Sequence, residues 1–219
     1  MVYKAKGSRT KDKILQYAKQ EFYEKGYENA WVKSIAKKSG TTLGNITYYF
    51  SKKDDMVTAI YSDFVENIYS FIDFQYTEDD LTIPPLQKYC MFLIICYHTV
   101  LNDENNIRFY HEIILKKSNY RVLHKSISKY YADIIKSFEL HLSDKDYSIF
   151  ILTQFGSRRE IFLSFFAGDL HLDLHELIYY LISNMCRNLG INQALYNEVI
   201  EISLTEVFKF DFSNIKFLI

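Results

Sequence analysis

Apolar residues recur every three or four positions along most of this chain of 219 residues, which is the spacing of one face of an amphipathic α-helix. A first helix is predicted from about residue 10 to residue 25, with Ala18 and Phe22 on its buried face and Gly26 as its stop. A second, longer stripe runs from Met56 to Phe71. Because the spacing is helical rather than alternating, and the sequence holds only 2 Pro and 7 Gly, we predict an all-α fold.

The segment from Val32 to Lys53 has the pattern of two short helices joined by a tight turn. Gly40 follows a short amphipathic stretch and is a candidate left-handed helix cap. Thr42 stands where its hydroxyl can cap the next helix, whose apolar stripe includes Ile46. This is the pattern of a helix-turn-helix, whose second helix enters the major groove of DNA. The residues expected on or near the DNA-facing side are Gly44, Asn45, Thr47 and Tyr48.

The rest of the chain predicts a larger helical body. The apolar stripe after Ser51 marks a long connecting helix that reaches to about residue 75, and residues 1–53 and 76–219 are the two expected domains. Pairs of turn-forming residues such as Asn102-Asp103 separate the predicted helices of the body. The helices expected there are 85–102, 104–117, 119–142, 145–167, 172–189 and 192–211.

Charge divides the chain in the same way. Residues 1–53 hold 12 Lys and Arg against 4 Asp and Glu, a net charge of +8, whereas the other 166 residues hold 14 against 23, a net charge of −9. Lysines near phosphates release counterions, and this release drives the salt-dependent part of DNA binding. A segment that carries both a charge of +8 and a helix-turn-helix pattern is therefore expected to face nucleic acid, rather than to be an ordinary solvated surface.

Other functions find less support. No Ser-His-Asp arrangement, Gly-rich phosphate loop or pair of carboxylates at catalytic spacing stands out, so we expect no enzyme activity and no cofactor. Cys90, Cys96 and Cys186 lack zinc or disulfide spacing and are expected to be buried thiols in a cytoplasmic protein. His171 and His175 share a helix face, but two ligands beside a loop do not make a metal site.

The stretch from Lys11 to Ser62 resembles the DNA-binding domain of the TetR family of bacterial transcriptional regulators. The resemblance covers about a quarter of the chain and combines three features: a Gly-Tyr break, a helix-turn-helix, and a Tyr-Phe-x-x-Lys passage into the fourth helix. It implies an all-α fold in which a three-helix head is joined by a long fourth helix to a ligand-binding and dimerisation body. The matching residues are Ile14, Leu15, Ala18, Phe22, Gly26, Tyr27, Val32, Ile35, Ala36, Gly40, Thr42, Gly44, Ile46, Tyr49, Phe50, Lys53 and Met56.

Residue by residue, the resemblance places the recognition helix at Leu43 to Tyr49. Tyr49 and Lys53 are implied phosphate contacts, and Thr47 stands where the family usually has a Tyr. Trp31 and Thr41 also depart from the usual residues, and Trp31 packs either on the DNA backbone or on the first helix. We expect phosphate contacts from Arg9, Lys33, Thr42, Thr47, Tyr49 and Lys53, base contacts from Leu43, Gly44, Asn45 and Tyr48, and a further DNA contact from Thr41.

For the body, the resemblance implies a homodimer through helices 145–167 and 172–189, and a cavity for a small apolar or aromatic effector. The expected function is a repressor that binds a palindromic operator and is released by the effector. Two alternatives remain open: a helical ligand carrier or enzyme with a head that does not read DNA, and a corepressor-dependent or activating regulator. The expected cavity residues are aromatic, namely Tyr89, Phe92, Tyr110, Tyr131 and Phe155.

Overall fold

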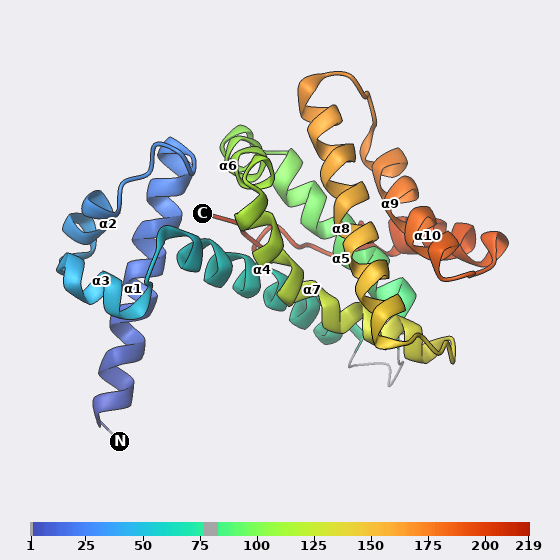
Figure 1. Cartoon of the computed structure of the whole chain (residues 1–219), viewed down its shortest axis with the longest axis horizontal. Coiled ribbons are helices and arrows are strands. Elements are labelled where there is room, and N and C mark those ends of the chain that lie inside the picture. Colours follow the sequence, from blue (N-terminus) through green and yellow to red (C-terminus); the bar gives the residue numbers. More distant parts are fainter. Residues whose placement is uncertain (1, 77–82) are drawn as a thin grey trace. The chain divides into compact units, whose positions relative to one another are not determined.

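The computed structural model describes residues 2–76 and 83–219, with backbone alone for residues 2–8 and 117–126. The residues so described form ten α-helices and no strand, which confirms the all-α prediction (Figure 1). The helices are α1 (Val2–Lys25), α2 (Val32–Ser39), α3 (Leu43–Tyr49), α4 (Lys53–Tyr76), α5 (Pro85–Leu101), α6 (Glu104–Leu115), α7 (Lys117–Ser137), α8 (Asp144–Ala167), α9 (Leu174–Asn188) and α10 (Gln193–Val207).

The chain forms two compact units. The first, here called the head unit, consists of Met1–Phe64, Val100–Leu123 and Lys216–Ile219. The second, here called the body unit, consists of Val65–Thr99 and His124–Ile215. Helix α6 and the last four residues therefore belong with the head, although the sequence pattern grouped them with the body.

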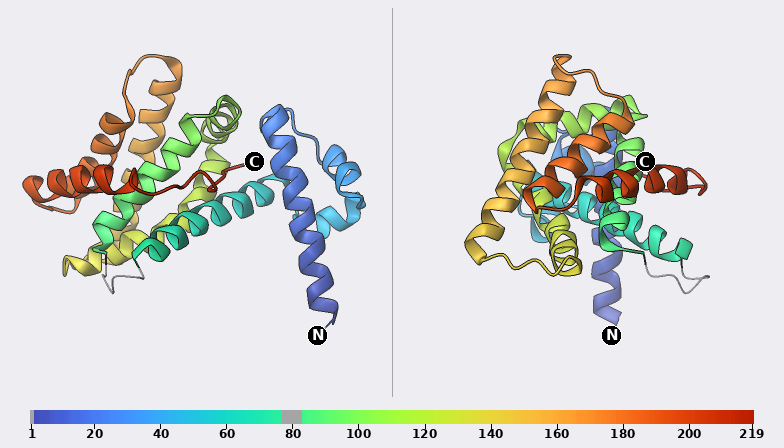
Figure 2. Two further views of the ribbon diagram at one scale, coloured as in Figure 1. Left: turned by 180° about the vertical axis from the view of Figure 1, so that it is seen from behind. Right: turned by 90° about the vertical axis from the view of Figure 1, so that its right-hand side faces the viewer.

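The helix-turn-helix of the head unit forms as the sequence predicts. Helices α2 and α3 lie beside α1 in the views of Figures 1 and 2. Gly40 ends α2 with φ 64° in the left-handed region, where a side chain would be strained. The Thr42 hydroxyl accepts a hydrogen bond from the Asn45 backbone N–H at 3.2 Å and so caps α3. Both predicted caps are confirmed.

A buried carboxylate fixes α2 on α1. The Glu21 side chain is fully buried and accepts contacts at 2.9 Å from Lys25, Ser34 and Lys38. Burial alone raises the pKa of Glu21, but the hydrogen bonds from Lys38, Lys25 and Ser34 outweigh it and lower the pKa to about 2. The carboxylate is therefore ionised at neutral pH and ties two helices together.

Gly26 ends the apolar part of α1 at a point where α6 comes close. Its φ of 74° favours glycine, and a Cβ there would lie 2.6 Å from the Glu112 carboxylate oxygens. The same carboxylate accepts a hydrogen bond of 2.8 Å from the Glu28 backbone N–H. The Gly-Tyr break thus serves two purposes, since it stops α1 and leaves room for α6.

The C-terminal residues complete the core of the head unit. Phe217 is 1% exposed, and its ring centroid lies 4.9 Å from that of Phe64 and 5.6 Å from that of Phe109. Leu218 is also buried. The apolar faces of α4 and α6 are therefore closed by a segment from the far end of the sequence.

The body unit is built on α5, whose residues from Tyr89 to Tyr97 are all buried. Helices α8 and α9 run side by side in opposite directions (Figure 2). The helix boundaries follow the sequence closely, with differences at the ends that have local causes. Helix α9 begins at Leu174 because Asp173 and Glu176 form a reciprocal capping box, and α7 ends at Ser137, with Glu139 in the left-handed region at φ 53°.

Candidate nucleic-acid interface

Helix α3 is anchored by one side chain and exposes most of the others. Ile46 is 1% exposed and holds the helix on the head, with Phe50 buried just after its end. Tyr48 is 82% exposed and Leu43 is 43% exposed. A seven-residue helix with one buried residue has little structural use for exposed apolar groups, so its outer face is available for contact.

The polar residues of α3 and the turn before it are bonded to one another. The Asn45 side-chain amide donates to the Thr41 hydroxyl at 3.0 Å, and the Thr47 hydroxyl donates to the Leu43 carbonyl at 3.0 Å. Asn45 and Thr47 are both exposed. Asn45 is thus held in a fixed orientation at the surface, whereas Thr47 must break an intrahelical bond before it can donate to a phosphate.

A hollow of 320 Å³ lies beside the turn and brings α1 into the same region. Its lining includes Arg9 and Lys13 from α1, together with Thr41 and Asn45. Two basic side chains next to two polar ones suit a phosphate oxygen. The structure thereby joins the predicted Arg9 to the predicted Thr41 and Asn45. It adds Lys13, which sequence reasoning missed, although Arg9 and Lys13 stand four residues apart on one helix face.

Lys53 is held inside the head unit. Its ammonium donates to the backbone carbonyls of Tyr27, at 2.5 Å, and Ala30, at 3.1 Å, and lies 4.2 Å from the centre of the Tyr27 ring. Burial lowers the pKa of Lys53 below its ordinary value. The residue therefore fixes the loop between α1 and α2, and the phosphate contact expected of it stays a prediction.

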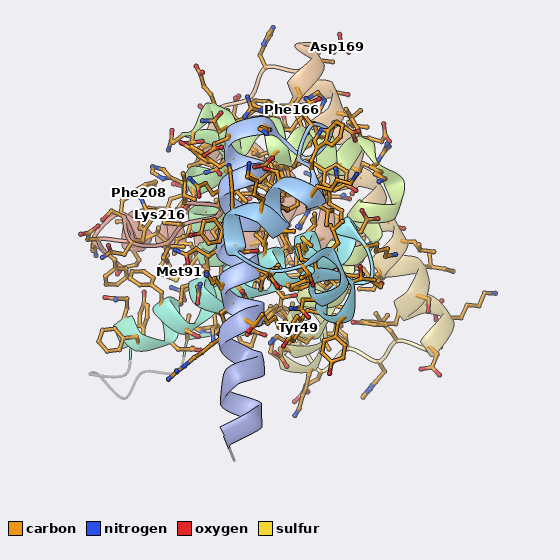
Figure 3. All side chains as sticks on the ribbon, turned by 90° about the vertical axis from the view of Figure 1, so that its left-hand side faces the viewer. Tyr49, Met91, Phe166, Asp169, Phe208 and Lys216 are labelled. Atoms are coloured by element: carbon orange, nitrogen blue, oxygen red, sulfur yellow. The ribbon has the colours of Figure 1, made fainter. Side chains whose placement is uncertain are left out.

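The remaining predicted contacts are all at least partly exposed. Tyr49, labelled in Figure 3, is partly exposed at the end of α3, and its ring meets that of Tyr48 edge to face at 5.0 Å. Lys33 is exposed on α2, and Gly44 is exposed on α3. Trp31 precedes α2 and is 66% exposed, so it does not pack into the core of the head.

In the body unit, four of the five predicted cavity residues come together. The ring of Tyr89 lies 5.9 Å from that of Phe92 and 5.2 Å from that of Tyr131, and Tyr131 lies 6.4 Å from Phe155. All four are buried. Tyr110 is buried too, but it stands on α6 in the head unit.

Two further classes of site were considered for the part of the chain that the structure describes. There, no group of three or more His, Cys, Asp and Glu side chains is placed to hold a metal ion. Within residues 2–76 and 83–219, no helix is both long enough and apolar enough to cross a membrane.

A capped turn, a short exposed helix behind it and basic residues around both define a DNA-binding head of the helix-turn-helix class. Residues 14–60 match the sequence model of the family described as "Bacterial regulatory proteins, tetR family". Over these residues the match confirms the resemblance to the TetR family that the sequence predicted.

Two proteins with similar sequences are described as regulators, in agreement with the DNA-binding class of the head. The chain is 29% identical over 125 residues to the "Fatty acid metabolism regulator protein" of Bacillus subtilis (strain 168), a match that covers 56% of this chain and 62% of that protein. It is 37% identical over 57 residues to the "Probable HTH-type transcriptional regulator YttP" of the same organism, which covers 26% of this chain and 28% of that one. The chain thus matches less than two thirds of the length of these relatives.

Solved structures extend the likeness to the whole fold. RolR in complex with resorcinol has a TM-score of 0.63 at 18% identity, over 90% of this chain and 95% of that one. TylP, a TetR regulator from Streptomyces fradiae, has a TM-score of 0.57 at 16% identity, over 93% of this chain and 98% of that one. The body therefore has the fold of TetR regulators such as TylP.

Proposed function

We propose that this protein is a transcriptional repressor that binds a palindromic operator as a homodimer and is released by a small effector. The observation that carries the proposal is the outer face of α3. Tyr48, Leu43 and Asn45 are exposed on a helix that is anchored through Ile46, and the basic residues Arg9 and Lys33 flank it.

In the head, one set of residues would contact the bases of DNA and another would contact its phosphates. A helix of seven residues is about 10 Å long, which fits the major groove. Asn45 can pair with an adenine edge and Leu43 can contact a thymine methyl group. Around them Arg9, Lys13 and Lys33 would bind phosphates, which position the helix without reading the sequence.

A second copy of the chain would pair through α8 and α9. Ile149 and Leu152 on α8 are 51% and 65% exposed, and Tyr180 on α9 is 48% exposed. Such exposed apolar residues on two neighbouring helices support an interface between identical subunits. The two heads of a dimer would then contact half-sites about one helical turn, ~34 Å, apart.

Release by an effector requires that the effector bind the DNA-free form more tightly than the DNA-bound form. Two relatives support an effector in the body, because one is a fatty acid metabolism regulator and another was solved with resorcinol. The buried aromatic group around Tyr89 and Tyr131 is the candidate location.

The proposal is tested by footprinting the purified full-length chain on DNA upstream of its own gene at low salt. We expect protection of a palindrome whose half-sites lie about one helical turn apart. Absence of any protected palindrome would favour the alternative of a ligand carrier or enzyme whose head does not read DNA. A verified effector that strengthens rather than weakens the footprint would instead identify a corepressor-dependent or activating regulator.

A further inference from the structure

The body unit holds a tyrosine hydroxyl that is buried without a hydrogen bond. Tyr69, on α4, is 4% exposed, and its hydroxyl has no hydrogen-bond partner within the part of the chain that the structure describes. Its ring is held in a stack, with its centroid 3.4 Å from that of Tyr130 and 4.8 Å from that of Phe92. A phenylalanine would make the same stack without burying a polar atom. The hydroxyl therefore indicates a partner that is not part of the chain.

Other tyrosine hydroxyls in the same aromatic group are bonded within the chain. Those of Tyr89 and Tyr131 share a hydrogen bond of 2.8 Å, and both accept from the buried guanidinium of Arg158. Phe92 connects this group to Tyr69, since its ring lies 5.9 Å from that of Tyr89. Burial raises the pKa of Tyr69 well above its ordinary value, so its hydroxyl stays protonated at neutral pH and requires an acceptor.

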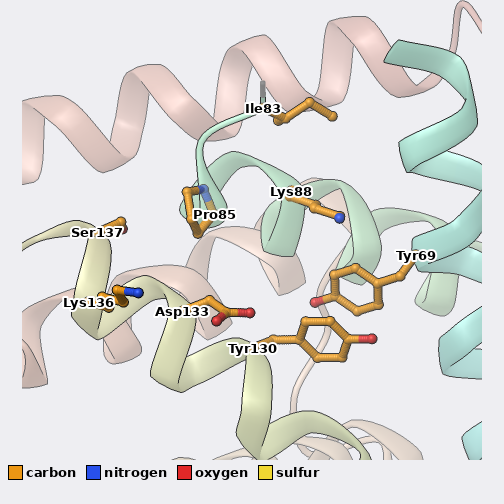
Figure 4. A pocket seen from close by; sticks show the side chains of 8 residues that line it. All are labelled: Tyr69, Ile83, Pro85, Lys88, Tyr130, Asp133, Lys136 and Ser137. Atoms are coloured by element: carbon orange, nitrogen blue, oxygen red, sulfur yellow. The ribbon is translucent and has the colours of Figure 1, made fainter. Parts of the chain in front are cut away.

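Tyr69 lines an open groove of 440 Å³ that α4, α5 and α7 border (Figure 4). Its hydroxyl and the carboxylate of Asp133 both point towards this groove in Figure 4. Asp133 is exposed and has no hydrogen bond or ion pair with any residue that the structure describes. Ile83, Pro85 and the ring of Tyr130 supply the apolar part of the lining. The groove thus offers one donor, one acceptor and an apolar wall.

The charges around the groove cancel. Lys88 and Lys136 line it with Asp133, and Lys88 forms an ion pair with Asp73, so two positive charges face two negative ones. The Lys88 ammonium lies over the Tyr69 ring, 5.5 Å from its centroid. Because Asp73 is 59% exposed, this ion pair contributes little, and the Lys88 side chain can move away from the tyrosine as a ligand enters. A groove without net charge favours an uncharged ligand.

We propose that this groove binds a small uncharged aromatic molecule that carries a hydroxyl group. The hydroxyl oxygen of the ligand would accept from Tyr69, a ligand O–H would donate to Asp133, and the aromatic ring would pack on Pro85 and Tyr130. A hydroxyl group suits these partners because it both accepts and donates a hydrogen bond. This inference rests on the proposed function, because it takes the molecule to be the effector.

The test compares molecules of one shape that differ in their polar group. Calorimetry and thermal shift on the full-length chain would use para-ethylphenol, para-ethylanisole, ethylbenzene and para-ethylbenzoate. We expect para-ethylphenol to bind about three- to tenfold more tightly than para-ethylanisole, which accepts but cannot donate, and at least about tenfold more tightly than ethylbenzene. Equal binding of the phenol and ethylbenzene, tighter binding of the benzoate than of the phenol, or no binding of any probe would overturn the inference.

Tyr69→Phe removes the buried hydroxyl and keeps the ring. Its preference for para-ethylphenol over ethylbenzene should fall about three- to tenfold. The unfolding midpoint without ligand should stay the same or rise, because the hydroxyl has no partner in the described part of the chain. An unchanged preference, or a lower midpoint that indicates a structural role, would contradict the inference.

Tyr147→Phe is the matched control, since it removes the same atom from another tyrosine of the body unit. The Tyr147 hydroxyl donates to the Ser128 backbone carbonyl at 2.9 Å, and Tyr147 does not line the groove. This variant should have a lower unfolding midpoint and keep the preference for the phenol. Equal loss of the preference in both tyrosine variants would overturn the inference.

Asp133→Ala tests whether the ligand lies in the open groove rather than in the buried core. Because Asp133 is exposed, the variant should fold, and its preference for para-ethylphenol over para-ethylanisole should disappear. Asp169→Ala removes an exposed carboxylate outside the groove and should keep that preference. A full preference in Asp133→Ala would contradict the inference.

The same samples are measured for operator binding, so that the two proposals can fail separately. Preference for the phenol without any DNA binding would refute the proposed regulator and leave the groove site standing. DNA binding without that preference would refute the groove site and leave the regulator standing.

Discussion

The candidate polar residues are exposed in the head unit, whereas the main ones of the body unit are buried. In the head unit, the candidate groups are exposed on a short helix, as Tyr48 and Asn45 are. In the body unit, Tyr69 and Arg158 are buried among aromatic rings. DNA is a large, charged, external partner, so a head that binds it needs an accessible surface. The small effector that we propose for the body would instead have to be surrounded, so its binding groups would lie inside.

The largest expected effect concerns the core that closes the head unit. Phe217→Ala removes a ring that is 1% exposed and packs on Phe64 and Phe109, so we expect a loss of about 3–5 kcal/mol in the free energy of unfolding. Urea unfolding measures it. Phe208→Ala is the control, because Phe208 is 53% exposed, and it should lose about 1 kcal/mol or less. Equal losses would mean that the C-terminal residues do not belong to the core of the head.

The second prediction concerns the subunit interface. Leu152→Asp places a charge on the exposed face of α8 and should convert the proposed dimer into monomers, with a loss of operator affinity of about tenfold or more. Light scattering after size-exclusion chromatography measures the mass. Leu195→Asp on α10, where the leucine is 39% exposed, is the matched control and should remain dimeric. A dimeric Leu152→Asp would move the proposed interface away from α8.

The third prediction uses the buried carboxylate of the head. The pKa of Glu21 is lowered to about 2, so its contribution to stability is complete above its ordinary value of 4.5 and is lost as the pH falls towards 2. Glu21→Gln should cost about 1–3 kcal/mol at neutral pH. Thermal unfolding of both proteins from about pH 6 to about pH 3 should show the gap narrowing as the pH falls.

The control is Glu24→Gln. Glu24 contacts the same Lys38 at 2.9 Å, but its side chain is 42% exposed, and exposed ion pairs contribute little to stability. We expect a small effect with little dependence on pH. A gap for Glu21→Gln that widens with acid would contradict the role given to this carboxylate.

The smallest effect separates two lysines of the head. Lys33→Met changes an exposed side chain, so it should weaken operator binding and lower the salt dependence by about one counterion without changing the unfolding midpoint. Lys53→Met removes the donor to the Tyr27 and Ala30 carbonyls, so it should lower the unfolding midpoint as well. If the two variants have the same operator affinity and the same unfolding midpoint, the two lysines do not differ in role as described.

The sequence predicts the head better than the body, for physical reasons. The helix-turn-helix depends on local rules: Gly40 for a left-handed cap, Thr42 for an N-cap and Ile46 for the anchor. Each can be recognised from its near neighbours in the chain, and the bounds that the family resemblance implied for α3, Leu43 to Tyr49, are confirmed.

What the sequence missed depends on contacts between distant residues. No local pattern shows that Lys53 turns inward to carbonyls 23 and 26 residues earlier, or that Phe217 closes a core begun by Phe64. Arginine is rarely buried, so no local pattern indicates that Arg158 lies in the core; its burial depends on contacts such as that with Tyr89, 69 residues away. The residues predicted to line a cavity are aromatic, as core residues often are. That four of them lie together and that Tyr110 belongs to the other unit could not be predicted without the fold.

The central claim is that the exposed face of α3 reads DNA. The most direct measurement is fluorescence anisotropy of a labelled operator with Tyr48→Ala, against Phe74→Ala as a control that also removes an exposed aromatic ring, since these residues are 82% and 68% exposed. We expect Tyr48→Ala to weaken operator binding by about 1–3 kcal/mol at unchanged thermal stability, and Phe74→Ala to bind like the wild type. If Tyr48→Ala binds the operator as tightly as the wild type, and Asn45→Ala does too, the face of α3 is not the DNA-reading surface.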